Sequence, residues 1–101
     1  MDIYSVYITP EANQDLLDLY NYIAEILKAP ATAIDYYFGA LDTINNLSVY
    51  GGSVAICQRE YIQRLYGPNT RTVVYKKMTI VFNVINDTIV IRCVMASSLV
   101  I

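Results

Sequence analysis

Apolar and polar residues alternate through the first nine positions of the chain. Tyr4, Val6 and Ile8 share one side of this alternation. A period of two is typical of a β-strand whose two faces are buried to different extents. The pattern therefore predicts a strand that runs to about Thr9.

Helical spacing follows this strand directly. Thr9, Pro10 and Glu11 supply a cap acceptor, a proline suited to the first helical position and an acid near the positive end of the helix dipole. From Ala12 onward, apolar residues recur at steps of three and four, which predicts an amphipathic helix of about five turns. Pro30 interrupts the pattern, so we expect a tight corner there.

A second helical pattern occupies residues 31–48 and ends before Gly51 and Gly52. We expect it to lie antiparallel to the first helix, because the corner between them is short. Residues 53–70 show no clear period and close with a Gly-Pro-Asn turn signal. This segment is predicted to be a long connection with room for short structure.

Three apolar, β-branched segments make up the last third of the chain: RTVVYKK, MTIVFNVI and TIVIRCVMA. Lys76-Lys77 and Asn86-Asp87 separate them and fit hairpin turns. The pattern predicts a three-stranded antiparallel meander. The lysine pair has an ordinary explanation in solubility and in protection of a sheet edge, and we assign no site to it.

These segments together predict an α+β fold with the order β-α-α-β-β-β in a single domain, residues 1–101. The helical hairpin is expected to pack on one face of a small twisted antiparallel sheet, which the first strand joins. Because the three later strands are apolar on both faces, we expect the second face to be covered as well, by another segment or by a partner.

Composition narrows the class of protein. Apolar residues make up 55% of the chain and charged residues 16%, which excludes a disordered segment. Asn83, Asn86, Asp87 and Arg92 interrupt the apolar C-terminal half, which excludes a membrane-spanning helix. The N-terminus carries an acid at position 2 and lacks a long apolar core, so it does not fit a secretory signal. A cytoplasmic protein is the expectation.

The chain contains no histidine. A Ser-His-Asp or Cys-His triad, a histidine general base and a histidine-ligated metal are therefore excluded. No phosphate-binding loop, dinucleotide fingerprint or metal-ligand cluster is present, so we expect neither a cofactor nor a metal. Cys57 and Cys93 lack the spacing of a redox pair and are interpreted as reduced, structural thiols.

Charge is distributed unevenly along the chain. Residues 1–50 hold seven acids and one base, and residues 51–101 hold six bases and two acids, which gives −6 and +4. The basic half could face an anionic partner. An ordinary solvated surface explains the same pattern equally well.

Arg71 and Arg92 stand out because they lie within apolar strands. Simple alternation places Arg92 between Val90 and Val94 on the same face of the last strand. An arginine there needs an acceptor or an exit to solvent. One interpretation is an ion pair with an acid of the helical half. The other is that Arg71, Arg92, Arg64 and Arg59 form a cationic surface on the open sheet face, which holds a polyanion or an acidic peptide.

Ten tyrosines are present, and those among the basic residues are candidates for stacking on a base or a partner ring: Tyr61, Tyr66 and Tyr75. Packing in the core, with the hydroxyl at a wet edge, is the competing explanation.

The order of these features resembles the RelE/ParE superfamily of type II toxins over nearly the whole chain. The resemblance rests on the helix that follows ITPEA, on Arg71 at the start of the second strand, on Phe82 in the middle strand and on the closing strand IVIRCVM. It implies a small cytoplasmic toxin that a cognate antitoxin neutralises by covering its exposed faces.

The superfamily has a branch that cleaves mRNA on the ribosome and a ParE branch that acts on DNA gyrase without being a nuclease. The cleaving branch needs basic residues on the sheet and a basic or aromatic tail. Here Arg71 matches one such position, but the middle strand carries Thr79 and the chain ends in ASSLVI. The resemblance therefore favours the ParE branch, a gyrase-binding toxin that is not an enzyme, with Arg71, Arg92, Arg64, Tyr66 and Tyr75 as binding residues.

Two alternatives stay open. In a ribosome-dependent endoribonuclease, Arg71, Arg64 and Arg92 would bind phosphate while Glu60 or Tyr75 handles protons, and nucleic acid would be bound directly. In a degenerate toxin, only antitoxin binding would survive.

Overall fold

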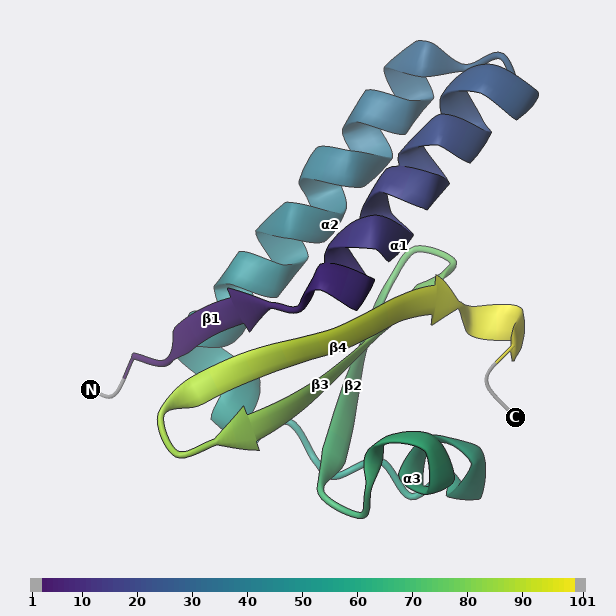
Figure 1. Cartoon of the computed structure of the whole chain (residues 1–101). Helices are drawn as coiled ribbons and strands as arrows, with labels where there is room; N and C mark the ends of the chain where they lie inside the picture. The colour runs from purple at the N-terminus through teal and green to yellow at the C-terminus, as the bar shows by residue number, and fades with distance from the viewer. Residues whose placement is uncertain (1–2, 100–101) are drawn as a thin grey trace.

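A four-stranded sheet carries helices on both of its faces in the computed structural model, which describes residues 3–99 (Figure 1). The elements follow one another as β1 (Ser5–Ile8), α1 (Pro10–Asn21), a π-helical turn (Tyr22–Ile26), α2 (Pro30–Tyr50), a 3₁₀ turn (Gly51–Ser53), α3 (Glu60–Tyr66), β2 (Thr70–Tyr75), β3 (Met78–Ile85), β4 (Thr88–Ala96) and a final 3₁₀ turn (Ser97–Leu99).

The sheet has the strand order β1-β4-β3-β2. The three later strands form the predicted antiparallel meander, with turns at Lys76 and Asn86, both of which have positive φ angles. The first strand joins the sheet as expected, but it runs parallel to β4, with Ser5 opposite Thr88, so the sheet is mixed rather than wholly antiparallel. A hairpin turn fixes the direction of consecutive strands, whereas strands joined through a long crossover are not constrained in this way.

The helical hairpin begins and bends where the sequence predicts. Thr9 caps α1 by accepting a hydrogen bond from the backbone N–H of Ala12 at 3.2 Å, and Pro10 occupies the first turn. The regular helix ends at Asn21 and continues as a π-helical turn, and Pro30 then starts α2. Within residues 3–99, none of the helices has both the length and the apolar character needed to cross a bilayer.

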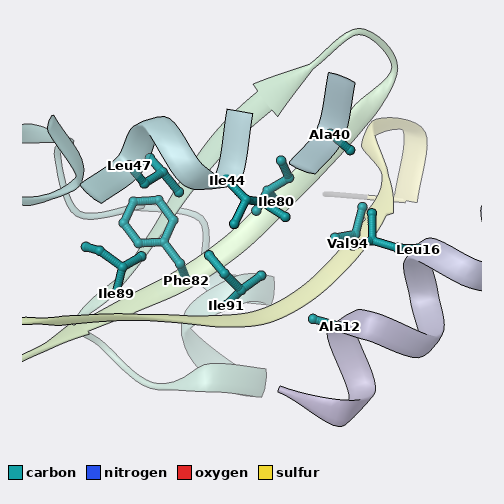
Figure 2. Packing of buried hydrophobic residues seen from close by; sticks show 10 residues of the cluster. All are labelled: Ala12, Leu16, Ala40, Ile44, Leu47, Ile80, Phe82, Ile89, Ile91 and Val94. Carbon is teal, nitrogen blue, oxygen red and sulfur yellow. The ribbon is translucent and has the colours of Figure 1, made fainter. Parts of the chain in front are cut away.

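The main core lies between this hairpin and one face of the sheet (Figure 2). Its fully or nearly fully buried members come from both helices and from the two central strands: Ala12, Leu16, Ala40, Ile44, Leu47, Ile80, Phe82, Ile89, Ile91 and Val94. Two of the helical contributors are alanines, which allow the helices to approach the sheet closely. The hairpin is thereby fixed over β3 and β4.

The second face of the sheet is covered in part by α3, which lies within the segment predicted as a connection. Ile62 of α3 is fully buried against Val81 of β3 and Cys93 of β4. The expectation that the second face is covered is therefore met in part by the chain itself. The rest of that face, along β4, is the region where a groove forms.

Candidate binding groove

A groove follows β4 between the start of α1 and the end of α3. One hollow of about 570 Å³ is lined by Glu11 and Asp15 from α1, by Arg92 and Cys93 from β4, and by Tyr66 from α3, among others. A second hollow of about 510 Å³ shares Asp15, Tyr66 and Cys93 with the first. A third of about 290 Å³ lies where Tyr66 and Arg92 meet the turn that follows α3. We call this continuous surface, defined by Asp15, Tyr66, Arg92 and Cys93, the β4 groove.

A β-bulge places Arg92 in this groove. Phe82 of β3 pairs with Ile91, and its neighbour Val81 pairs with Cys93, so Arg92 is the extra residue of β4. At a bulge, two residues on one strand oppose one on the other. Arg92 and Cys93 therefore both line the groove.

The bulge also corrects one expectation from the sequence. Val94 lies in the helix-covered core rather than on the face that carries Val90 and Arg92. Simple alternation placed Val94 beside Arg92, and the extra residue reverses the side on which the rest of the strand presents its side chains.

Arg92 is held by a neutral network rather than by an ion pair. Its Nη1 donates to Asn83 Oδ1 at 2.9 Å, and its guanidinium lies 5.6 Å from the centre of the Tyr66 ring. Asn83 Nδ2 in turn donates to the Thr70 hydroxyl at 3.3 Å, and that hydroxyl donates to the Gly67 carbonyl at 2.8 Å. No carboxylate among residues 3–99 forms an ion pair with Arg92, so its charge is available to a partner.

Two acids of α1 face this arginine across the groove. Asp15 Oδ2 accepts a hydrogen bond from the backbone N–H of Val94 at 3.0 Å, which ties α1 to β4. Burial raises the pKa of the Asp15 carboxyl above its usual value, and the hydrogen bond from Val94 offsets part of that rise. Glu11 lines the same hollow. The groove therefore presents one cation among acidic and aromatic groups.

Tyr66 and Cys93 form the floor of the groove and are neutral at pH 7. Burial raises the pKa of the Tyr66 phenol, and the neighbouring Cys93 thiol raises it further. Burial also raises the pKa of Cys93. A thiol in this state is a poor nucleophile, since reactivity resides in the thiolate. The arrangement suits contact and shape recognition.

Arg71 lies on the opposite face of the sheet, so its expected place on the open face is wrong. It sits across from Phe82 in the β2–β3 register, on the helix-covered side. Its Nη1 donates to the carbonyls of Gly52 at 2.8 Å and Gly51 at 3.2 Å. The positive charge thus stabilises the C-terminal end of α2, where unpaired carbonyls accumulate. Arg71 is therefore held by backbone carbonyls, rather than by the ion pair of the first interpretation.

Tyr75 is also on the helix-covered face. Its ring packs edge-on against Tyr36 with centroids 6.1 Å apart, and its hydroxyl fills the space beside Gly39, where an added Cβ would lie 1.8 Å from the oxygen. Lys76 Nζ lies over both tyrosine rings. These contacts favour the packing interpretation of Tyr75.

The remaining basic candidates lie on or beside α3. Arg64 is exposed and pairs with Glu60 one turn earlier. Arg59 is exposed at the N-terminal cap position of α3, and Tyr61 packs against the small core beneath the helix. The predicted cationic surface is therefore divided: Arg92 and Tyr66 come together, Arg64 is exposed elsewhere on α3, and Arg71 and Tyr75 are on the other side of the sheet.

Asp15, Asn83 and Cys93 belong to the site but were not predicted as site residues. Asn83 had a visible signal, because a single amide interrupts the apolar run MTIVFNVI. Cys93 reaches the groove through the bulge, which has no signature in the sequence. Asp15 falls among the polar positions of an amphipathic helix, and nothing in the sequence separates it from the other acids there.

In the sequence, Thr79 and the C-terminal residues serve to choose between the two toxin branches. The structure describes Thr79 and the C-terminal residues as far as Leu99. The Thr79 hydroxyl shares a hydrogen bond of 2.9 Å with the hydroxyl of Ser97. Val100 and Ile101 lie outside the described residues. Among residues 3–99, no group of His, Cys, Asp or Glu side chains is arranged to hold a metal ion.

Solved structures share this arrangement of helices and strands. A chain of the chromosomal ParDE TA system from P. aeruginosa superposes with a TM-score of 0.78 at 19% identity, over 95% of this chain and 98% of that one. The chain has the RelE/ParE-like fold. A chain of the toxin–antitoxin complex RelBE2 from Mycobacterium tuberculosis superposes with a TM-score of 0.56 at 22% identity, over 93% of this chain and 98% of that one.

No protein-family model matches the sequence, and no curated protein matches it significantly. The likeness therefore resides in the arrangement of the helices and strands, and the α+β fold predicted from the sequence is confirmed.

Proposed function

We propose that this chain is the toxin of a type II toxin–antitoxin pair, that it acts in the manner of ParE by binding DNA gyrase, and that a cognate antitoxin neutralises it. The observation that carries the proposal is the whole-chain likeness to a ParDE component, which covers 95% of this chain and 98% of the other. Fold alone does not fix function, so the chemistry of the groove must agree with it.

The β4 groove supports binding of a protein rather than cleavage of RNA. A ribonuclease of the RelE kind needs several cations gathered at one phosphate. Here Arg71 caps α2 on the far face and Arg64 pairs with Glu60. Among residues 3–99, Arg92 is the one basic side chain in the groove, which Asp15 also lines. One cation with acids and an aromatic ring resembles the polar and aromatic mixture of a protein interface.

Expression of the chain without its antitoxin tests the proposal. We expect growth arrest, relief of the arrest by the product of an adjacent antitoxin gene, and inhibition of supercoiling when the purified protein is added to purified gyrase. Arg92→Gln and Tyr66→Leu should weaken the inhibition. Lys77→Gln, an exposed change in the β2–β3 turn, serves as the matched control and should have no effect.

Three results would overturn the proposal or part of it. Codon-linked mRNA cuts in cells, mapped at 5′ ends, would replace the gyrase inhibitor with a ribosome-dependent endoribonuclease. Inert expression together with tight antitoxin binding would mean a degenerate toxin. Absence of both toxicity and antitoxin binding would reject a toxin–antitoxin role altogether.

A further inference from the structure

The second face of the sheet has a small core of its own, separate from the main core under the helical hairpin. Its buried members are Ile62 of α3, Val81 of β3 and Cys93 of β4. The sheet divides the two cores, and Figure 1 shows α3 apart from α1 and α2. A small cluster beneath a loop segment is typically a satellite of the main core. The contacts that seat α3 are therefore distinct from those that seat the hairpin.

Few side chains hold α3 on the sheet. Of the α3 residues, all of which the structure describes, Ile62 alone is fully buried. Tyr61 and Tyr66 are half-buried beside it, and the centre of the Tyr66 ring lies 5.6 Å from the Arg92 guanidinium. The attachment of α3 thus depends chiefly on Ile62 and on the tyrosines next to it.

The chain around α3 has little regular structure to keep the helix in place without these contacts. A backbone hydrogen bond of 2.8 Å from the Cys57 N–H to the Thr70 carbonyl closes the base of the segment. Gly67, directly after the helix, has a φ of +102°, which favours glycine. α3 itself has seven residues, and an isolated helix of about that length is not stable in water. Release from the sheet should therefore unfold this segment as one local unit.

Tyr66 makes α3 a wall of the β4 groove. All three hollows of the groove are lined by Tyr66. Cys93 lines two of them, belongs to the small core and is 7% exposed. Loss of α3 from the sheet would remove the wall and uncover the Cys93 thiol.

We propose that α3 is a movable wall of the β4 groove: it opens by local unfolding while the main core stays folded, and this opening uncovers Cys93. The groove is complete only while α3 is closed, so a partner that contacts Tyr66 in the groove also holds α3 closed. The inference does not rest on the proposed function, because it concerns the stability of α3 on the sheet and not the identity of a partner.

The Cys93 thiol reports on the opening. In a Cys57→Ala chain it is the only cysteine, and its reaction with the chromogenic disulfide reagent DTNB at one fixed pH is followed by absorbance. We expect a rate proportional to the DTNB concentration and at least about tenfold above the rate that global unfolding, measured by urea denaturation, would permit. Urea below the unfolding transition should change this rate little, because a short segment exposes little surface when it opens.

Two matched variants in the same background separate local from global opening. Ile62 and Ile44 are both 0% exposed, Ile62 in the small core and Ile44 in the main core. Ile62→Val should raise the labelling rate about threefold to tenfold, because it removes one buried methylene group from the contacts that α3 loses on opening. Ile44→Val should change the rate less than about twofold, because the main core is intact in the open state.

Hydrogen exchange followed by mass spectrometry provides a second measurement. The amides of α3 should exchange well before those of β3 and β4, which lie in the part of the protein that stays folded. Exchange of α3 at the rate of the two central strands would contradict local opening.

Several labelling results would also overturn the inference. Equal acceleration by Ile62→Val and Ile44→Val, or a rate with the urea dependence of global unfolding, would mean that α3 opens only with the whole protein. An unchanged rate in Ile62→Val would mean that the reagent reaches Cys93 through the closed groove. Circular dichroism shows whether each variant is folded, and the urea dependence in the Cys57→Ala chain tests the inference without either isoleucine variant.

Discussion

Asn83 accepts a hydrogen bond from Arg92 across two neighbouring strands, at 2.9 Å between Oδ1 and Nη1. Asn83 is 8% exposed, and its amide holds the arginine of the β4 groove and the Thr70 hydroxyl at once. A buried amide satisfied on both sides fixes the groups around it, and its loss takes the acceptor from Arg92 and the donor from the Thr70 hydroxyl.

Replacement of Asn83 by leucine should destabilise the protein. We expect the free energy of unfolding to fall by about 2 kcal/mol, because the Arg92 guanidinium and the Thr70 hydroxyl lose their shared partner. Urea denaturation followed by circular dichroism measures the change. Asn46→Leu on the exposed face of α2 is the control, and an equal cost for the two variants would contradict the role of the network.

Arg71→Met tests whether this arginine is structural. We expect a loss of about 2 kcal/mol, because the carbonyls of Gly51 and Gly52 lose a charged donor at the end of α2. Arg64→Met should cost less than about 0.5 kcal/mol, because its ion pair is exposed. Chemical denaturation of both variants measures the two losses in the free energy of unfolding. Similar costs would mean that Arg71 does not cap the helix.

The effect of Gly39→Ala on stability should depend on whether position 75 holds tyrosine or leucine. In the wild type an added Cβ would lie 1.8 Å from the Tyr75 hydroxyl oxygen and 2.4 Å from Cζ, so the substitution should destabilise. In a Tyr75→Leu background the obstruction is removed, and alanine should stabilise α2 by up to about 1 kcal/mol through its higher helix propensity. A double-mutant cycle of thermal or urea unfolding measures the coupling. Additive effects would show that the two residues do not meet.

Stability should decline on the alkaline side. The pKa of Cys93 and that of Tyr66 are both raised in the folded protein, so above the unfolded-state values the folded chain holds more protons than the unfolded chain. The free energy of unfolding therefore falls as the pH rises through about 8.5 and beyond. Below that pH, Cys93 and Tyr66 are protonated in both the folded and the unfolded chain, so their contribution to the free energy of unfolding is fully present.

Cys93→Ala should flatten this decline, and Cys57→Ala should not, because the Cys57 thiol lies outside the β4 groove. Urea unfolding of the wild type and both variants at several pH values between 7 and about 10 provides the measurement. An unchanged slope in Cys93→Ala would contradict the assignment of the pH dependence to the groove.

Much of the fold could be predicted because its determinants are local. Thr9 and Pro10 specify the start of α1, Pro30 specifies the start of α2, and the meander follows from β-branched segments separated by short turns. The parallel direction of β1 and the presence of α3 depend on contacts between distant segments, and local patterns do not encode these.

The candidate site was predictable only in part, for a related reason. Arg92 and Tyr66 could be selected by residue type, and the structure brings them together. Arg71 and Tyr75 looked equivalent to them in the sequence, but the register of β2 turns both toward the helices. The bulge at Arg92 shifts every later side chain of β4 by one position, and no pattern of apolar residues indicates where such an insertion falls.

The parallel pairing of β1 with β4 also bears on the order in which the chain can assemble. Of the strands in the described sheet, β1 is synthesised first, yet its only neighbour there is β4, the last of them, and Ser5 pairs with Thr88. Contacts between such distant segments form late, because the ends of a long loop must first be brought together. A nascent chain therefore leaves this edge of its sheet open until β4 has been synthesised, and the four-stranded sheet cannot close before that point.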